Sequence, residues 1–339
     1  MIDAHAHPRP VAALKDALRF GVTTVLDMGS DGHENVLRNA AASRVDIADV
    51  RSAGFVATAP GGHGTEFGHV VPTVSGPGAA EAFVEARKAS GADYVKVVLN
   101  GSRTATAGTQ HLSEDTVRAL VQAAHARKML VVAHVESQAD VQTALAAGVD
   151  ILGHVWRDGG AAPELAQRIR AQGAFVSPTL TVPDSLVPGA LASVAADPRL
   201  APFLSDSQRA QLARPALFPP LKNIDPRVDA ARSLVKAGVQ LLAGSDAGGA
   251  MPTLMGLSLH RELELLVKSG LTPTQALASA TANVADAFRL PDRGRILPGH
   301  RADLLLVRGD PTIDITATRD VLRVWRSGVE FDRSVPWPR

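Results

Sequence analysis

The stretch MLVVAHVESQADVQTALAAGVDILGH, residues 129–154, is the part of the sequence that most clearly indicates the fold class. It holds two short apolar runs, each ending in histidine. The segment between them places Val141 and Leu145 on one side and ends at Gly148. Such apolar runs are typical of strands buried on both faces of a parallel sheet, and the segment between them is typical of a crossover helix. The stretch therefore predicts a strand, a helix and a second, parallel strand.

The same alternation of apolar runs and helical segments continues in both directions along the 339 residues. Further strands are expected at residues 1–7, 22–28, 54–58, 94–99, 174–178 and 239–246. Helices are expected at residues 11–20, 79–90, 162–171 and 226–237, and one after the capping residue Ser113. Eight strand–helix units in series predict an α/β fold, the (β/α)₈ or TIM barrel, whose active site lies at the C-terminal ends of the strands.

Two stretches depart from this alternation. Residues 179–225 are rich in proline and longer than an ordinary loop, so we expect them to form an irregular lid insertion over the mouth of the barrel. After residue 290 the pattern changes to short strands separated by turns. We therefore expect a barrel over residues 1–290 and a small β appendage over residues 291–339.

The composition excludes several classes of function. The 35 basic and 34 acidic residues nearly cancel, and no basic stripe suggests a nucleic-acid or membrane partner. There are no cysteines, so a metal would have to be held by histidine and oxygen ligands. Neither a signal segment nor a long apolar run occurs. We expect a cytoplasmic protein that acts on a small-molecule substrate.

Polar residues at the C-terminal ends of the predicted strands indicate the site. A single histidine at a strand end is more often a hydrogen-bonded core residue than a metal ligand. Several unpaired polar groups buried at one level of a barrel would cost several kcal/mol, and a shared cation cluster would give each of them a partner. The residues at this level are His5, His7, Lys96, His134, His154 and Asp246. His5 and His7 share one face of their strand, about 7 Å apart.

This pattern resembles the binuclear site of the amidohydrolase superfamily, and the resemblance covers essentially the whole chain. The tail GRILPGHRADL, residues 294–304, is similar to the usual exit of that superfamily from the barrel into a small β-sandwich. Residues 259–273, which begin LHRELELL, are similar to the branch with imidazolonepropionase-like and prolidase-like enzymes. The superfamily usually has a further segment before His-x-His, which forms half of the sandwich and is absent here. We therefore expect an incomplete sandwich, exposed sheet edges that would allow a homo-oligomer, and fraying at His5 and His7.

The resemblance implies two divalent metal ions. His5, His7 and Asp246 would bind the first and His134 and His154 the second, and Lys96, carboxylated by CO₂, would bridge them. Burial in an apolar strand should lower the pKa of Lys96 and favour the neutral amine that reacts with CO₂. Zinc is the default metal, and the same ligands also suit Mn, Co or Fe. A metal-activated hydroxide would attack, and Asp246 would pass its proton to the leaving group.

The function that the resemblance implies is metal-dependent hydrolysis of amide-like C–N bonds, such as those in dipeptides or N-acyl amino acids. A loop histidine, His63, is expected to contact substrate or to order its loop, and His69 and Arg103 could bind a substrate carboxylate. A deaminase of the same superfamily is an alternative, although Lys96 argues against it. Lactone or organophosphate ester hydrolysis and a catalytically impaired, truncated barrel also remain open.

Overall fold

The computed structural model describes residues 1–29, 32–65, 70–99, 110–213, 218–249 and 251–334. Parallel strands form two sheets, ordered β1-β2-β3 and β4-β5-β6-β7. The strands are β1 (Ile2–Ala6), β2 (Thr24–Asp27), β3 (Asp49–Ser52), β4 (Tyr94–Val98), β5 (Leu130–His134), β6 (Ile151–Gly153) and β7 (Phe175–Ser177). Their side chains are almost all buried, as the apolar runs predict.

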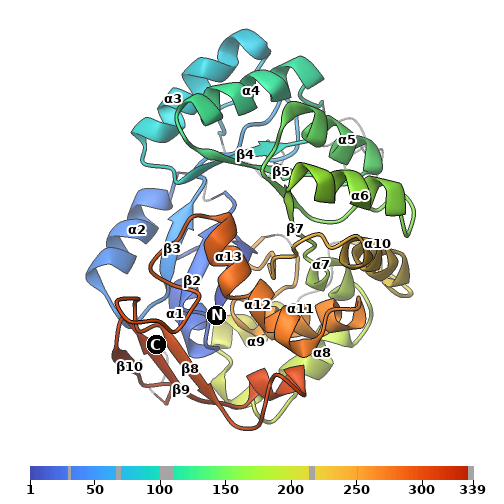
Figure 1. Ribbon diagram of the computed structural model, residues 1–339. Coiled ribbons are helices and arrows are strands. Elements are labelled where there is room, and N and C mark those ends of the chain that lie inside the picture. Colours follow the sequence, from blue (N-terminus) through green and yellow to red (C-terminus); the bar gives the residue numbers. More distant parts are fainter. Residues whose placement is uncertain (30–31, 66–69, 100–109, 214–217, 250, 335–339) are drawn as a thin grey trace.

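The two sheets join into one closed ring through single backbone bridges. Ala57 pairs with Val97 on β4, Leu241 pairs with Val176 on β7, and Ala247 pairs with Ala6 on β1. The predicted eighth strand, residues 239–246, therefore lies between β7 and β1. Figure 1 shows the ring with helices around it. The predicted (β/α)₈ barrel is confirmed.

The predicted third strand, residues 54–58, was placed wrongly. The strand lies at Asp49–Ser52, and in residues 54–58 only Ala57 and Thr58 make isolated bridges. Gly54, at φ +64°, turns the chain away from the sheet between the two segments. The apolar pattern missed β3 because it carries Asp49 and Arg51, whose charges are paired with residues far along the chain.

The helices that the sequence predicted lie within two residues of their expected ranges, whereas α2 was not predicted. Ser113 accepts a hydrogen bond from the Thr116 backbone, and Ser137 and Asp140 form a capping box at the start of α5. The outer helices are α1 (Ala12–Arg19), α2 (Glu34–Ser43), α3 (Ala80–Ala89), α4 (Glu114–Ala126), α5 (Gln138–Ala147), α6 (Pro163–Gln172), α10 (Asp225–Lys236) and α11 (Leu257–Lys268). Among the described residues, none of the helices combines the length and apolarity needed to cross a membrane.

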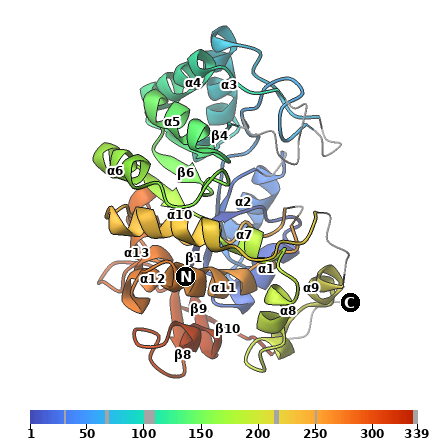
Figure 2. The same cartoon turned by 90° about the vertical axis from the view of Figure 1, so that its right-hand side faces the viewer.

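The described part of the insertion, residues 179–213 and 218–225, contains short helices, whereas an irregular segment was expected. They include α7 (Thr181–Asp184), α8 (Ala190–Ala195) and α9 (Asp206–Leu212). Leu191 and Val194 pack with Leu254 and Leu257, and Gln208 donates to the Met255 carbonyl. The insertion therefore packs against α11 and the loop before it, as Figure 2 shows.

After the barrel, α12 (Pro273–Ser279) and α13 (Ala282–Ala287) lead to an antiparallel sheet. Its strands are β8 (Leu304–Val307), β9 (Val321–Arg326) and β10 (Val329–Phe331), in the order β10-β9-β8. The expected small β appendage is therefore present.

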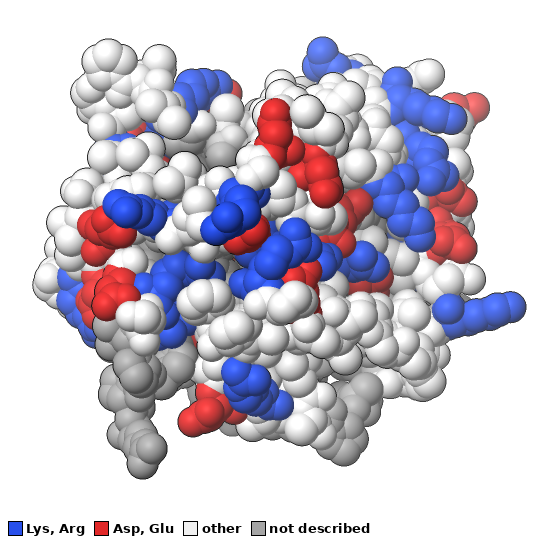
Figure 3. Space-filling view, turned by 90° about the horizontal axis from the view of Figure 1, so that it is seen from below, with Lys and Arg blue, Asp and Glu red and all other residues white. Residues whose placement is uncertain are grey.

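On the face of the molecule shown in Figure 3, basic and acidic side chains are interspersed.

The first strand does not fray as expected. The Met1 amine is buried and donates to the Gly21 carbonyl at 2.9 Å, and the Ile2 amide donates to the Ala280 carbonyl. Burial lowers the pKa of this amine to about 6. Because β1 is paired on both sides, by β2 and by residues 243–247, His5 and His7 are held inside the sheet.

A buried ion cluster holds the segments after the barrel against β3. Asp49 accepts hydrogen bonds of 2.7 Å from Arg293 and from Arg301, and Arg326 lies 3.5 Å away. Burial raises the pKa of Asp49, but its bonds and ion pairs with Arg293, Arg51 and Arg301 outweigh this and lower the pKa to about 2. The charged form of Asp49 therefore stabilises the folded state.

Asp49→Asn is expected to lower the free energy of unfolding at pH 7 by about 2–3 kcal/mol, because asparagine lacks the negative charge that the surrounding arginines stabilise. A carboxyl with a depressed pKa contributes its full stability above the unfolded pKa near 4. That contribution is lost as the pH falls from about 4 to about 2. Urea unfolding at pH 7 and pH 3 should show the two proteins converging at the lower pH.

Asp46→Asn is the matched control, since its exposed pair with Arg44 should contribute less than about 1 kcal/mol. Equal unfolding midpoints for the wild type and Asp49→Asn at pH 7 would contradict the stabilising role of the cluster.

Candidate metal centre and active site

The structure brings all six predicted ligand residues together at the C-terminal ends of the strands. The ring centroids of His134 and His154 are 4.5 Å apart, those of His154 and His5 4.7 Å, and those of His5 and His7 5.7 Å. The four histidines come from three different parts of the chain, at the ends of β1, β5 and β6, and they meet because parallel strands end at one face of the barrel. Lys96 and Asp246 lie against the same histidines.

His5, His7 and Asp246 form the tightest group. One ligand atom from each lies within 4.8 Å of the others. The Asp246 Oδ1 is 3.1 Å from His7 Nε2 and 3.5 Å from His5 Nε2. His7 Nδ1 donates to the Gly29 carbonyl at 3.0 Å, so its Nε2 is the atom turned toward Asp246. These residues therefore fit a divalent cation.

The charge balance of this group also favours a cation. Burial lowers the pKa of His7, but the Asp246 carboxylate beside it outweighs this, and the net shift is upward. The position between His7 Nε2 and Asp246 therefore attracts positive charge, whether a proton or a metal ion.

Lys96 is 2% exposed, and its Nζ lies 3.3 Å from His5 Nε2. Burial lowers its pKa to about 7, although the carboxylates of Asp246 and Asp27 act in the opposite direction. A Cβ on Gly153 would stand 3.1 Å from Nζ and 3.0 Å from the His5 ring. Glycine at this position therefore keeps space open around the lysine amine.

His134 and His154 form a second group, and burial keeps both in the neutral form that binds metals. It lowers the pKa of His134 to about 4 and that of His154 well below its usual value. The Thr179 hydroxyl donates to the Pro178 carbonyl, so it accepts from His154 Nδ1 at 2.6 Å. This bond leaves His154 Nε2 free as a ligand atom.

The backbone is strained at this site. His154, Thr179 and Asp246 have φ values of +74°, +48° and +51°, a region that residues other than glycine rarely occupy. Each such residue costs on the order of 1–3 kcal/mol and persists only where its surroundings enforce it. Two predicted ligands, and the threonine that bonds one of them, are therefore held in unfavourable backbone conformations at the same site.

Sequence reasoning missed the residues that support these ligands. Glu136 Oε1 lies 3.4 Å from His134 Nε2 and accepts a 2.6 Å hydrogen bond from Arg157. Glu262 is fully buried on α11 and accepts from the Leu180 amide and from the amide and hydroxyl of Thr181. Glu136 could have been found, because a residue two places after a strand-end histidine shares its side. Glu262 offered no such local signal.

The predicted substrate-binding residues are only partly covered by the structure. The His63 ring lies 5.2 Å from the His134 ring, at the predicted face of the barrel. His69 and Arg103 lie outside the described residues.

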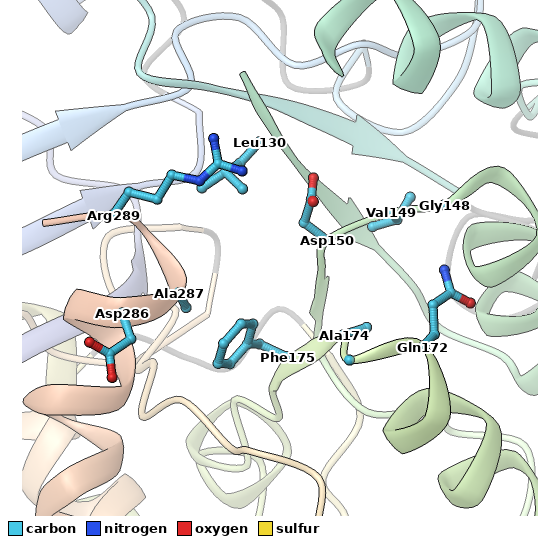
Figure 4. Close-up of a pocket in the computed structure, with 11 residues that line it drawn as sticks. Leu130, Gly148, Val149, Asp150, Gln172, Ala174, Phe175, Asp286, Ala287 and Arg289 are labelled. Carbon is cyan, nitrogen blue, oxygen red and sulfur yellow. The ribbon is translucent and has the colours of Figure 1, made fainter. Parts of the chain in front are cut away.

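A cavity of about 250 Å³ lies at the opposite end of the strands. Leu130, Asp150 and Phe175, which lie at the N-terminal ends of β5, β6 and β7, line it together with Ala287 and Arg289 (Figure 4). It is separated from the histidine cluster by the length of the barrel and plays no part in the site.

Comparison with known protein families gives a match that covers nearly the whole chain. The model of the amidohydrolase family matches residues 11–330.

Curated relatives match over shorter stretches. An imidazolonepropionase of Deinococcus deserti is 37% identical over 102 residues, 29% of this chain and 25% of that protein. An imidazolonepropionase of Anaeromyxobacter sp. (strain K) is 45% identical over 78 residues, 22% and 18% of the two chains. An adenine deaminase of Lysinibacillus sphaericus is 37% identical over 71 residues, 21% and 11%. The matched stretches span a quarter or less of each relative.

Solved structures are similar over the whole chain. The putative prolidase from Bifidobacterium longum has a TM-score of 0.77 and 26% identity, covering 100% of this chain and 81% of that one. A Xaa-Pro dipeptidase with bound methionine has a TM-score of 0.76 and 23% identity, covering 98% and 86%. The Aspergillus niger ochratoxinase has 0.75 and 21%, covering 98% and 82%. These structures share the barrel fold.

Proposed function

This chain belongs to the amidohydrolase family, and we propose that it is a metal-dependent hydrolase of C–N bonds in dipeptides or N-acyl amino acids. The observation that carries the proposal is the convergence of His5, His7 and Asp246 on one point, with Lys96, His134 and His154 beside it. The similarity to a Xaa-Pro dipeptidase and to imidazolonepropionases supports it.

Two divalent ions, with zinc as the default, are the cofactors that fit these residues. His5, His7 and Asp246 would hold one, His134 and His154 the other, and Lys96 would contact both. When bound, such ions polarise a substrate carbonyl and lower the pKa of a water molecule.

Lys96 would bridge the ions as a carbamate. With a pKa of about 7, a substantial fraction of its amine is neutral at physiological pH. The neutral nitrogen adds to the carbon of CO₂ and releases a proton, which gives a group with two oxygens. Gly153 supplies the space beside Nζ that this enlargement needs.

Asp246 would move the proton. Its Oδ1 lies against both His5 and His7, and its side chain is 15% exposed, so it reaches the face where a substrate arrives. It would accept the proton of the attacking water and donate it to the leaving nitrogen. His63, whose ring lies 5.2 Å from that of His134, would contact the acyl part of the substrate. The described part of the insertion, residues 179–213 and 218–225, would cover the mouth of the barrel.

Deamination is the second candidate, because the curated relatives include adenine deaminases. Both reactions break a C–N bond, but deamination releases ammonia and hydrolysis of an amide releases an amine and an acid. Product analysis on one substrate panel separates them.

The experiment is metal analysis followed by a substrate panel. Protein reconstituted with Zn²⁺ and bicarbonate should hold about two ions per chain and cleave dipeptides or N-acyl amino acids. Absence of bound metal after reconstitution would contradict the proposed mechanism. Turnover of lactones alone would contradict the proposed substrate class.

Thr179→Val keeps the volume of the side chain and removes the acceptor for His154 Nδ1. We expect a loss of about 10-fold to 100-fold in affinity for the second metal ion, because the ring is no longer fixed in the ligating orientation. Competition with a fluorescent chelator measures this affinity. Thr181→Val, which removes a bond to Glu262 that does not touch a histidine, should have a smaller effect. Equal affinities for Thr179→Val and the wild type would contradict the assignment.

A further inference from the structure

The loop that follows β6 is rigidly built, although it lies beyond the last ligand residue of that strand. The indole of Trp156 is buried and donates to the Gly160 carbonyl at 3.0 Å. Asp158 accepts from the Gln138 amide at 2.9 Å, and its carbonyl accepts from the Gln138 side chain. These contacts fix the position of Arg157 between them.

Arg157 points back toward the second group of histidines. Its Nη2 donates to Glu136 Oε1 at 2.6 Å, and the same oxygen lies 3.4 Å from His134 Nε2. The Arg157 guanidinium is therefore linked through the Glu136 carboxylate to His134, a predicted metal ligand. Its side chain is 37% exposed, so part of its hydrogen-bonding edge faces solvent rather than protein.

A second guanidinium lies on the neighbouring helix. The same loop packs on the first turn of α10, where a Cβ on Gly160 would stand 3.8 Å from the Pro226 carbonyl. Arg227 follows Pro226 and is half-buried. Burial and then the positive charge of Arg157 lower its pKa, while Glu136 opposes them. Within the described part of the chain, its guanidinium has no hydrogen-bond or ion-pair partner.

We propose that Arg157 and Arg227 form an anion-binding subsite beside His134 and His154 that receives the carboxylate of the substrate. The subsite carries two positive charges and one negative charge, that of Glu136, so it matches a group with a single negative charge. Guanidinium groups bind carboxylates through paired N–H donors, which fixes orientation as well as adding affinity.

This inference rests on the proposed function and narrows it. A carboxylate on these arginines would place the adjoining C–N bond over the histidine cluster. The preferred substrates would then be dipeptides and N-acyl amino acids with a free carboxylate, rather than neutral amides of the same shape. Arg157 and Arg227 would be the residues that determine this specificity.

The test compares binding of N-acetyl-L-methionine with binding of its neutral carboxamide by isothermal titration calorimetry, using the full-length, metal-loaded protein. The wild type should bind the acid about 10-fold to 100-fold more tightly than the amide, as expected for hydrogen bonds to a charged group. Arg227→Gln should remove most of this preference, because it removes one of the two positive charges of the subsite. Since Arg227 contacts no metal ligand, the substitution should leave the metal site unchanged. Arg157→Gln should also reduce it.

Arg232→Gln is the matched control, since Arg232 lies on the same helix but pairs with Asp229. It should keep the preference for the acid. Inorganic phosphate serves as a competing anion, and stronger competition by phosphate than by acetate would overturn the carboxylate assignment.

Equal affinity of the wild type for the acid and the amide, or no measurable binding of the acid, overturns the subsite. A retained preference in Arg227→Gln does so too. Turnover assays with the same pair distinguish the two proposals. If the wild type cleaves the acid and the amide equally well, the proposed function stands and the subsite is rejected. If the wild type prefers to bind the acid, Arg227→Gln loses this preference and neither compound is cleaved, the subsite is supported and the proposed function is rejected.

Discussion

Replacing Lys96 with alanine is expected to lower kcat/KM by about 10³-fold or more, since a bridging group that serves two ions contributes several kcal/mol to catalysis and each 1.36 kcal/mol changes the rate tenfold. The bound metal should fall from about two ions per chain toward one or none. Metal analysis and steady-state kinetics on the same preparation measure both effects.

A carbamate on Lys96 leads to a more specific prediction than the loss of activity in Lys96→Ala. Alanine leaves a buried space beside His5 and Gly153, and a small carboxylate such as acetate or propionate can enter it and supply two oxygens. Added acetate should therefore restore part of the metal content and part of the activity of Lys96→Ala. Lys96→Arg should stay inactive, because its guanidinium remains charged and cannot react with CO₂.

Lys88→Ala is the control, because Lys88 is an exposed residue on α3. It should keep wild-type kinetics and should not respond to acetate. Full metal content and unchanged kinetics in Lys96→Ala would show that the lysine is only a buried structural residue.

The sequence was informative about this barrel wherever a residue's role depended on its position along a strand. His134 and His154 could be placed at one face because both end apolar runs, and parallel strands end at the same face. The same reasoning failed for β3. Its charged residues Asp49 and Arg51 are paired with partners that include Arg293, more than two hundred residues away, and no local pattern reports such a pairing.

The supporting residues show the same limit within the site. Glu262 holds residues 180 and 181, which follow the Thr179 that orients His154. This connection passes through three separated segments and depends on the packing of α11. In the sequence, Glu262 reads as one charged residue of an amphipathic helix. Ligand positions follow from strand geometry, but their partners follow from the tertiary packing.

Replacing Asp246 with asparagine is expected to lower kcat/KM by about 10²-fold to 10⁴-fold, the range that a positioned general base contributes. Asparagine keeps the size of the side chain. It also tolerates the left-handed φ of +51° at this position, where alanine would be strained. The substitution therefore removes the charge and the proton acceptor without an added backbone cost.

Because Asp246 is both a predicted ligand and the predicted base, two measurements are needed to separate these roles. Metal analysis reports the ligand role, since the first ion should bind more weakly when its ligand Asp246 is replaced by a neutral residue. The rate at saturating metal reports the base role. A large fall in kcat that persists in Asp246→Asn protein shown to hold two ions assigns the proton transfer to Asp246.

Asp150→Asn is the matched control, because Asp150 lies at the N-terminal end of β6 and bonds to His125 and the Val131 amide. It should change stability without changing kcat by more than a small factor. Wild-type kcat in fully metallated Asp246→Asn would contradict the base role. The proton would then have to leave through another group on the same face, such as Glu136 or His63, which both lie beside His134.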